Sequence, residues 1–405
     1  ALQRTMWRRD VHWLPTGLVL VSASYAMSVL NNLLGQRLEI GLGLMDRYHW
    51  DELTRGLDGC WLALLVFCAV HALAVYYLSL QGAQLRLAQA QAAARDAEQV
   101  RRALGYGKVN VWGGSYGTRL GQAYARAFPD SVRTLVLDGV AAPDQVIPAG
   151  GRDGNAALDK LFDQCARDAA CNKAYPNLRA EFGALVKRTE AGIRLSIADP
   201  RTAAPVTFTM TGQRFLGTVH NILYSPADAR RLPFLLHSAY NGRWEPFVAR
   251  HNIAGDFASD ASTATLLYLA VVCAEDVPRM TPELLKEDNA LLTRPMAERI
   301  PNLCKDMKVP AVPYAAPGKI AAPALLLSGA LDPVTPPRRA ERAAEFMSNA
   351  RHLVVENAGH GVSQLGCAPR LLREFLDKPT AKLDASCLAE IPAPTFQLGS
   401  AGPQP

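Results

Sequence analysis

The chain has 405 residues, of which 49% are hydrophobic and 20% are charged, and these proportions are typical of folded globular proteins rather than of disordered chains. The formal net charge of +6 arises from 43 basic and 37 acidic residues. Because the sequence contains no Lys/Arg-rich run with interleaved aromatic residues, nucleic acid is not an expected partner. The length predicts more than one structural unit.

Two apolar segments dominate the beginning of the chain. Residues 13–30 and 60–80 contain no Asp, Glu, Lys or Arg, and each has close to the ~20 residues that a helix needs to cross a bilayer core. We predict that residues 1–90 form a membrane hairpin-like segment with one or two transmembrane-like helices. A secretory signal is the alternative for the first segment, because Arg8 and Arg9 precede it. The flanking basic residues predict that both ends lie in the cytoplasm.

Residues 91–140 predict a helix, a strand, a tight turn and a second helix, followed by a buried strand at 132–138. Gly113–Gly117 fits the pattern G-x-S-x-G, with Ser115 at its centre. In α/β-hydrolases this pattern marks a nucleophilic serine on a sharp strand-to-helix turn. The β-prone run 109–112 and the amphipathic helix after the turn supply the context that the pattern needs.

Two later segments complete a catalytic pattern. A buried strand at 323–330 leads to Asp332 in a proline-rich loop, and a last strand at 352–356 leads to His360 between two glycines. We expect these strands to join the two earlier ones in a parallel sheet. The chain order serine, aspartate, histidine is that of α/β-hydrolases.

The three residues suit acyl transfer. A serine hydroxyl is a weak nucleophile near neutral pH, so it needs a base, and the base needs an acceptor that orients it. Ser115 would attack a carbonyl carbon, His360 would take and return the proton, and Asp332 would orient His360. The backbone N–H of Tyr116 would stabilise the oxyanion. The alternatives are a turn serine, a turn-capping aspartate and a loop histidine. This chemistry implies no metal and no cofactor.

Five motifs together resemble one family. They are "RRALGYGKVNVWGGSYGTRL", "VVCAEDVPR", "PALLLSGALDPVTPP", "NAGHGVSQLGCAPRLLREFLD" and "LDASCL". The chain from about residue 92 to about residue 394 resembles the tripeptidyl-aminopeptidase-like serine hydrolases, which are α/β-hydrolases related to proline iminopeptidases. The resemblance implies Ser115, Asp332 and His360 as the catalytic triad, a cap over the site, and peptide substrates attacked near a free N-terminus.

The interval 141–314 is too long to be a loop between two core strands, and its helical patterns predict a cap domain. Residues 91–140 then form the first part of the core, residues 315–394 the second part, and residues 395–405 a tail. An exopeptidase needs an acid that holds the substrate's α-ammonium group. Glu275 and Asp276 are the candidates, and an acidic turn before Pro278 is the alternative.

Six cysteines lie outside the apolar segments. They suggest disulfides rather than a zinc site, because they form no short CxxC pair and no histidines accompany them. The resemblance favours local pairing, as Cys165–Cys171, Cys273–Cys304 and Cys367–Cys387. Disulfides imply a secreted or periplasmic location, whereas the flanking charges place the same part of the chain in the cytoplasm. We therefore predict membrane association with an extracytoplasmic hydrolase part, and the sequence leaves the topology open.

The family normally has its first strands, and a Gly-rich loop that donates a second oxyanion N–H, before the elbow. Neither "HGG" nor "GGPG" occurs before residue 113. The predicted fold is therefore an α/β-hydrolase core that is incomplete on its N-terminal side, with a helical cap. The predicted function is that of a serine exopeptidase whose activity is impaired by this gap. A membrane-tethered esterase or lipase and an inactive fusion remnant are the alternatives.

Overall fold

The computed structural model describes residues 90–402 except 199–201, 251–264, 288–290 and 308. The chain divides into two compact units, Ala1–Arg86 and Leu87–Pro405, and the first unit lies outside the described residues. Both predicted membrane segments, 13–30 and 60–80, fall there. Across the described part of the chain, no helix combines the length and the apolar character that a membrane span requires.

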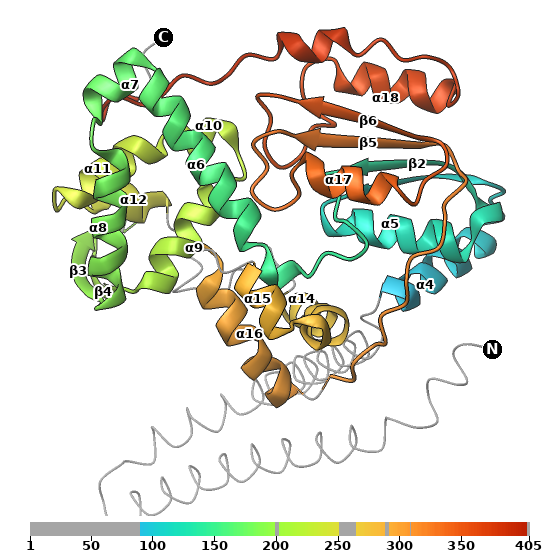
Figure 1. The fold of residues 1–405 in the computed structure, drawn as a ribbon, viewed down its shortest axis with the longest axis horizontal. Helices are drawn as coiled ribbons and strands as arrows, with labels where there is room; N and C mark the ends of the chain where they lie inside the picture. Colours follow the sequence, from blue (N-terminus) through green and yellow to red (C-terminus); the bar gives the residue numbers. More distant parts are fainter. Residues whose placement is uncertain (1–89, 199–201, 251–264, 288–290, 308, 403–405) are drawn as a thin grey trace, which may run out of the picture. The chain divides into compact units, whose positions relative to one another are not determined.

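Four parallel strands form the central sheet, in the order β1-β2-β5-β6 (Figure 1). Their bounds are β1 Val109–Gly114, β2 Val132–Asp138, β5 Ala324–Gly329 and β6 Ala350–Val355. These are the four strands expected from the apolar runs, so the predicted parallel sheet is confirmed. A parallel sheet is covered on both faces, and the carboxyl ends of its strands meet at one edge.

Helices cover both faces of this sheet. Leu135 and Leu137 point to one face, where they join a core cluster with residues of α4, α5 and α17. Val136 points to the other face and packs with Phe375 of α18, as the alternation of side chains along a strand requires. The core helices are α4 Ala90–Ala103, α5 Tyr116–Ala127, η1 Pro129–Ser131, η2 Ile147–Ala149, α17 Pro337–Ala344, α18 Ala368–Asp377 and η5 Ser386–Glu390.

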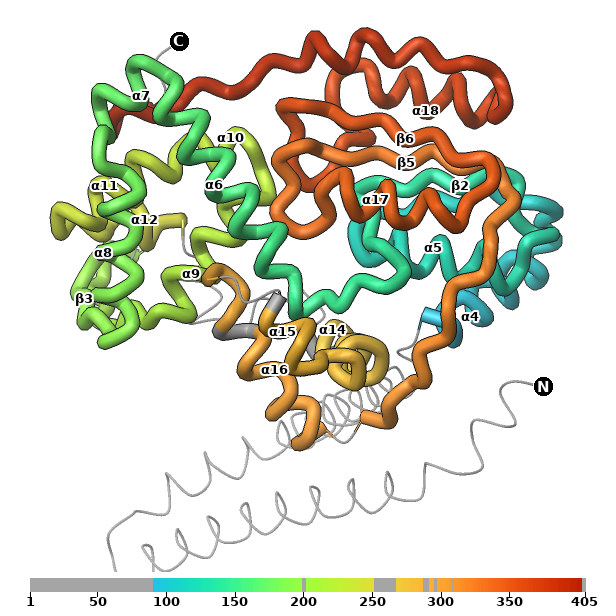
Figure 2. The backbone as a smooth tube through the Cα atoms, viewed as in Figure 1, coloured from blue at the N-terminus to red at the C-terminus, as the bar shows by residue number. Residues whose placement is uncertain are grey.

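A second lobe lies beside the sheet, as the tube in Figure 2 shows. It has a hydrophobic core of its own, which includes Phe182, Phe215 and Phe247. Its elements are α6 Gly151–Arg167, α7 Ala169–Ala174, α8 Leu178–Glu190, β3 Ile193–Ala198, β4 Pro205–Met210, α9 Gly212–Ile222, α10 Pro226–Ala229, α11 Leu232–Tyr240 and α12 Glu245–Arg250. β3 and β4 form an antiparallel hairpin. This lobe occupies the position in the chain that was predicted for the cap.

A further group of short helices connects the cap to β5. It comprises α14 Thr265–Val271, the π-helix η3 Val272–Asp276, η4 Val277–Arg279, α15 Pro282–Glu287 and α16 Arg294–Met307. Ion pairs also join the cap to the core. The buried carboxylate of Asp153, in the first turn of α6, accepts hydrogen bonds from Arg338 (2.6 Å) and Arg339 (2.8 Å) of α17.

The C-terminal segment packs on the cap. Figure 1 shows the chain running from the end of the core back to the cap lobe. Phe396 is buried in the cap's hydrophobic cluster, and the guanidinium of Arg230 lies 4.1 Å from its ring centroid. The backbone N–H of Gln397 donates to the carbonyl of Arg230 (3.1 Å). Within the segment predicted as a tail from residue 395, the apolar side chain of Phe396 therefore anchors the chain to the cap.

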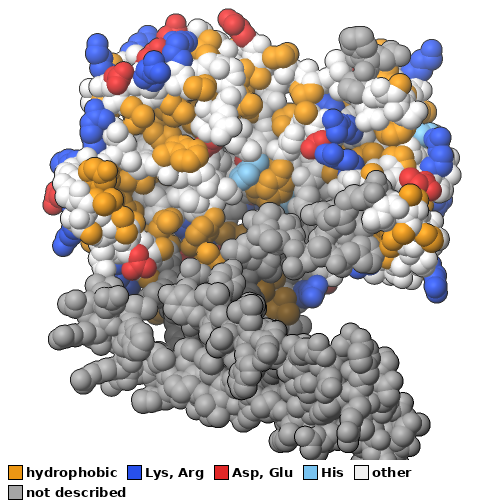
Figure 3. All heavy atoms as spheres, turned by 180° about the vertical axis from the view of Figure 1, so that it is seen from behind, with side chains coloured by type: hydrophobic (Ala, Val, Ile, Leu, Met, Phe, Trp, Pro, Cys, Tyr) orange, Lys and Arg blue, Asp and Glu red, His pale blue; other side chains and the backbone are white. Residues whose placement is uncertain are grey.

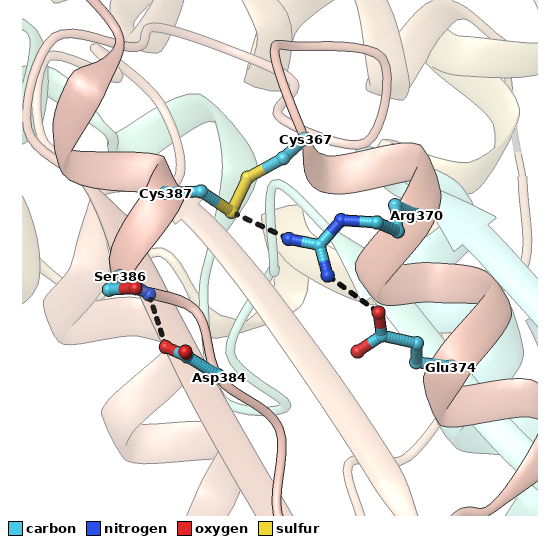
Figure 4. Close-up of a disulfide and its surroundings, with 6 residues drawn as sticks. All are labelled: Cys367, Arg370, Glu374, Asp384, Ser386 and Cys387. Carbon is cyan, nitrogen blue, oxygen red and sulfur yellow. Dashed lines mark hydrogen bonds and ion pairs between the residues drawn. A yellow bond between two sulfur atoms is a disulfide. The ribbon is translucent and has the colours of Figure 1, made fainter.

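The structure contains three disulfides, Cys165–Cys171, Cys273–Cys304 and Cys367–Cys387. These are the pairs that the family resemblance implies. Figure 4 shows the third, which ties the start of α18 to η5, with the guanidinium of Arg370 against the sulfur of Cys387 and the carboxylate of Glu374. Each bond joins segments that are close in sequence, so each stabilises a local part of the fold.

The outer edge of β1 has no partner strand among the described residues. Trp112 in this strand is 61% exposed, and three other large apolar residues near it in sequence are also exposed, namely Val100, Leu104 and Tyr106. Hydrophobic side chains also gather on the face of the described residues that is seen from behind (Figure 3). An open edge beside apolar side chains is a site where sheets tend to acquire a further strand.

Candidate active site

Ser115 occupies the turn between β1 and α5 with an unusual backbone conformation. Its φ of 53° and ψ of −123° lie in a region that non-glycine residues rarely adopt. Its N–H donates to the carbonyl of Asp138 (2.9 Å), and its carbonyl accepts from the backbone N–H (2.9 Å) and the hydroxyl (2.6 Å) of Thr118. These bonds hold the strained turn, and Ser115 is exposed at its tip.

The first glycine of the motif has a steric reason. A Cβ atom on Gly113 would lie 2.2 Å from the carbonyl oxygen of Gly117, so only glycine allows the strand to approach the helix this closely. Tyr116 is the first residue of α5, and the first N–H groups of a helix have no acceptor within it. The N–H of Tyr116 is therefore available at the place where the sequence predicted an oxyanion donor.

Asp332 and His360 form a hydrogen-bonded pair. His360 Nδ1 lies 2.8 Å from Asp332 Oδ2, and the carboxylate of Asp332 has no exposed surface. The N–H groups of Val334 and Thr335 donate to Asp332 Oδ1 (2.8 Å each), and the hydroxyl of Thr335 donates to Oδ2 (2.7 Å). Every oxygen of this buried carboxylate is thus hydrogen-bonded, as an ionised group in a protein interior requires.

The pair shifts both pKa values in the direction that suits a base and its acceptor. Burial by itself lowers the pKa of His360, but the hydrogen bond to Asp332 and the negative charge of that carboxylate outweigh it and raise the pKa above 6.5. Burial likewise raises the pKa of Asp332, and the hydrogen bonds from His360 and Thr335 outweigh it and lower the pKa below 3.8. Asp332 is therefore ionised whenever His360 titrates.

Two residues at the end of β2 bring the serine and the histidine to one place. The carbonyl of Asp138 holds the N–H of Ser115. The next residue, Gly139, has φ +65°, and a Cβ on it would lie 3.1 Å from His360 Cε1. The carboxylate of Asp138 accepts N–H bonds from Val362 (2.8 and 3.0 Å) and Ser363 (2.8 Å). The loop that carries His360 is thereby fixed beside the turn that carries Ser115.

Glu275 and Asp276 lie on η3 and contact two arginines. Arg119 lies 3.0 Å and Arg279 2.7 Å from Asp276 Oδ1, and the side chain of Asp276 is completely buried. The side chain of Glu275 is 16% exposed, 3.5 Å from Arg119, and accepts the N–H of Ala90 (2.6 Å). Both arginines contact Oδ1, whereas Oδ2 is buried without a hydrogen-bond partner among the described residues. The complete burial of the side chain argues against an ammonium anchor at Asp276.

A family model described as the alpha/beta hydrolase fold matches residues 88–363, which is more than half of the chain. The chain belongs to the α/β-hydrolase family. The part of this hydrolase that the structure describes contains no cluster of His, Cys, Asp and Glu able to hold a metal ion.

Curated relatives of this hydrolase are similar over short segments. The serine protease Hip1 of Mycobacterium tuberculosis is 40% identical over 82 residues, 19% of this chain and 16% of that protein. The tripeptidyl aminopeptidase of Streptomyces lividans is 50% identical over 87 residues, 21% of this chain and 16% of that protein. The proline iminopeptidase of Neisseria gonorrhoeae is 51% identical over 45 residues, 11% and 14% of the two chains. The chain thus matches only a small part of each relative's length.

Solved structures of α/β-hydrolases are similar over more of the chain but at low scores. MGS-M2, an alpha/beta hydrolase enzyme from a Medee basin deep-sea metagenome library, has a TM-score of 0.30 and 16% identity, and the match covers 73% of this chain and 74% of that one. A thermophilic esterase from Thermogutta terrifontis has a TM-score of 0.28 and 15% identity over 72% and 74%. These scores add nothing to the family assignment.

The sequence analysis missed three residues that hold the site of this hydrolase. Thr335 donates to the carboxylate of Asp332, and Asp138 holds the loop that carries His360. The carbonyl of Tyr224, in the cap, accepts the N–H of His360 (2.9 Å), and its ring packs against the imidazole with the centroids 5.1 Å apart. Asp138 ends a predicted parallel strand, a position typical of site residues. No pattern near Tyr224 indicates its contact, because the cap meets the core only in the folded chain.

We expect the hydrolytic activity to depend on a neutral His360. Because the pKa of His360 is raised above 6.5, kcat/KM should fall as the pH is lowered through a single acidic limb with its midpoint above 6.5. The measurement is the pH–rate profile of kcat/KM on a peptide amide. A midpoint below pH 6 in the folded enzyme would contradict the role of the Asp332 pair.

Thr335→Val should slow the reaction because it removes a hydroxyl that donates to the carboxylate of Asp332. A hydrogen bond to a charged group is worth about 1.5–3 kcal/mol, so we expect kcat/KM to fall about tenfold to a hundredfold. Thr335→Ser keeps the hydroxyl and should stay near wild type. A loss in Thr335→Ser with no loss in Thr335→Val would instead show that the methyl group of Thr335, and not its hydroxyl, supports the site.

Proposed function

We propose that this chain is a serine exopeptidase that releases short peptides from substrates with a free N-terminus. The observation that carries the proposal is the hydrogen-bonded pair of Asp332 and His360. The imidazole of His360 lies against Gly139, and the preceding residue, Asp138, accepts the N–H of Ser115. The names of the similar proteins, among them a tripeptidyl aminopeptidase and a proline iminopeptidase, support peptide substrates and cleavage near the N-terminus.

The proposed reaction passes through an acyl-enzyme. Ser115 Oγ attacks the peptide carbonyl carbon while His360 takes its proton, and the N–H of Tyr116 donates to the resulting oxyanion. His360 then gives the proton to the leaving amine as the C–N bond breaks. Water, deprotonated by His360, attacks the acyl-enzyme and frees the peptide and Ser115. A second oxyanion donor is not assigned to any residue of the described part.

Glu275 is the better candidate for the ammonium anchor. Its side chain keeps some exposed surface, whereas that of Asp276 has none. Burial raises the pKa of the Tyr116 phenol, and the negative charge of Glu275 raises it further. Glu275 is thus within electrostatic reach of the residue that follows the nucleophile. Asp276 instead holds Arg119 and Arg279 in place.

Three disulfides support an extracytoplasmic location for this part of the chain, because such bonds persist in oxidising compartments. Membrane attachment through residues 13–30 and 60–80 stays a prediction. Fractionation of expressing cells, followed by protease treatment of intact cells, tests both. Retention of free thiols at all six cysteines in the native protein would contradict the location.

A fluorophosphonate probe tests the nucleophile. We expect a single covalent adduct on the folded full-length protein, located at Ser115 by mass spectrometry of its peptides, and no adduct after heat denaturation. Folded protein that stays unlabelled would contradict the enzymatic proposal and favour an inactive remnant.

Tripeptide amides with free and with acetylated N-termini test the substrate class. We expect hydrolysis of the free form to be faster by at least tenfold, because a charge pair with the α-ammonium contributes to binding. Equal rates would remove the ammonium anchor, and cleavage of aryl esters without any cleavage of peptides would favour the esterase alternative.

A further inference from the structure

A pocket of about 460 Å³ lies between α4, α5 and residues 312–318. Neither Ser115 nor His360 lines it. Figure 1 shows α4 beside α5 at this side of the core, and the two helices are in contact. Arg126, in the last turn of α5, stands eleven residues after Ser115, which corresponds to about 16 Å along the helix. The Arg126 end of this pocket is therefore distant from Ser115, whereas Arg119, about one helical turn after Ser115, and Glu275, the candidate ammonium anchor, also line the pocket.

The charged residues of the pocket are mostly cationic. The charged side chains that line it are those of Arg95, Arg119, Arg126, Arg279 and Glu275. Two of the four arginines have carboxylate partners, because Arg119 and Arg279 both contact Asp276 and Arg119 also lies near Glu275. The positive charges of Arg119 and Arg279 are thus compensated by the negative charges of Glu275 and Asp276.

Arg95 and Arg126 remain without a counter-ion among the described residues. Arg126 is partly buried, and its guanidinium donates only to neutral groups, the carbonyl of Gly318 (2.9 Å) and the amide oxygen of Gln122 (3.4 Å). Arg95 is exposed and makes no ion pair within that set. A partly buried guanidinium without a carboxylate is unfavourable unless an anion compensates it.

The remaining wall supplies apolar and aromatic surface. Phe128 and Tyr314 line the pocket together with several prolines and alanines, and the guanidinium of Arg279 lies 4.7 Å from the ring centroid of Tyr314. The side chain of Arg119 is 9% exposed, and its Nε is buried without an acceptor. The guanidinium of Arg119 already donates to Asp276 (3.0 Å) and to the carbonyl of Gln145 (2.6 Å), so this arginine belongs to the wall of the pocket.

We infer that this pocket binds a small organic anion, whose oxygens accept hydrogen bonds from Arg126 and Arg95 and whose apolar part lies against Phe128 and Tyr314. Guanidinium groups bind carboxylates and phosphates through paired N–H donors. Both ligand groups share this chemistry, and the apolar wall favours a carboxylate on an aromatic or aliphatic body. The contacts to this ligand come from neither Ser115 nor His360, although Glu275, the candidate ammonium anchor, lines the same pocket.

Isothermal titration of the full-length protein with benzoate and, separately, with inorganic phosphate tests the inference at constant ionic strength. We expect saturable binding that weakens at least tenfold in Arg126→Gln and in Arg95→Gln. Arg133→Gln is the matched control, because Arg133 is an exposed arginine on β2 that does not line the pocket. Arg95 makes no ion pair in the described part of the protein, and melting curves check that neither variant acts through a loss of stability.

The titrations with benzoate and with phosphate distinguish the possible ligands. Binding of benzoate but not of phosphate supports a carboxylate ligand with an apolar body, and binding of phosphate, or competition between the two, supports an oxyanion ligand in general. No saturable binding of either probe, or equal weakening in Arg133→Gln, would overturn the site. Fluorophosphonate labelling of Ser115 should be unchanged in both pocket variants, so failure here and failure of the proposed peptidase are distinguishable.

Discussion

Ser115→Ala is expected to lower kcat on a peptide amide by a factor on the order of 10⁶. The reason is that the attacking oxygen disappears, while the pair of His360 and Asp332 stays in place. The strained backbone at Ser115, with φ 53°, adds a second expectation. Alanine tolerates this conformation no better than serine does, so the stability should change little. Steady-state kinetics and thermal unfolding of the purified variant measure both effects.

Ser348→Ala is the matched control for this experiment. Ser348 is exposed between α17 and β6, so the same chemical change there should leave kcat and the fluorophosphonate adduct unaltered. If Ser115→Ala kept more than a tenth of the wild-type rate, a different nucleophile would have to be responsible, and the assignment of the motif would be wrong.

Asp332→Asn should lower kcat by about 10⁴-fold, because an amide cannot fix the tautomer of His360 or stabilise its cation. The pH profile provides a second readout with a definite sign. The hydrogen bond and the charge of Asp332 are what raise the pKa of His360, while burial acts in the opposite direction. In the variant the acidic limb of kcat/KM should therefore move to lower pH.

Asp377→Asn provides the comparison for Asp332→Asn, because Asp377 is an exposed acid at the end of α18. It should leave both the rate and the pH profile unchanged. A limb of Asp332→Asn that stayed at the wild-type pH would mean that Asp332 supports the fold without acting on His360. This shift also distinguishes an electrostatic role from a loss of stability, which lowers the amount of active enzyme at every pH.

The parts of the fold that were predictable depend on short stretches of sequence. The four core strands are uninterrupted apolar runs such as 323–330, and a run of that kind is buried on both faces wherever a parallel sheet forms. Ser115 was recognisable from the G-x-S-x-G pattern, and the 2.2 Å approach at Gly113 gives the steric reason for its first glycine. Such constraints act within about ten residues, so a pattern can express them.

Contacts between distant segments left no comparable pattern. The hydroxyl of Thr335, the carboxylate of Asp138 and the carbonyl of Tyr224 reach the candidate site from three separate parts of the chain. The two candidate anchors, adjacent in the sequence, differ in the structure because Asp276 lies between two arginines and Glu275 keeps some exposure. The polar composition of the C-terminal segment likewise hid the burial of Phe396 in the cap.

The sequence alone determined which serine, aspartate and histidine are the candidates, which strands carry them and in what order, because each of these features depends on local backbone geometry. Only the tertiary structure decided that the carboxylate of Asp332 is buried against His360 and that Asp138 and Gly139 join their loop to the turn of Ser115. It also decided that Arg126 lines a pocket without a counter-ion among the described residues. The physical reason is that burial and charge compensation depend on every segment that packs around a group, and those segments meet only when the chain folds.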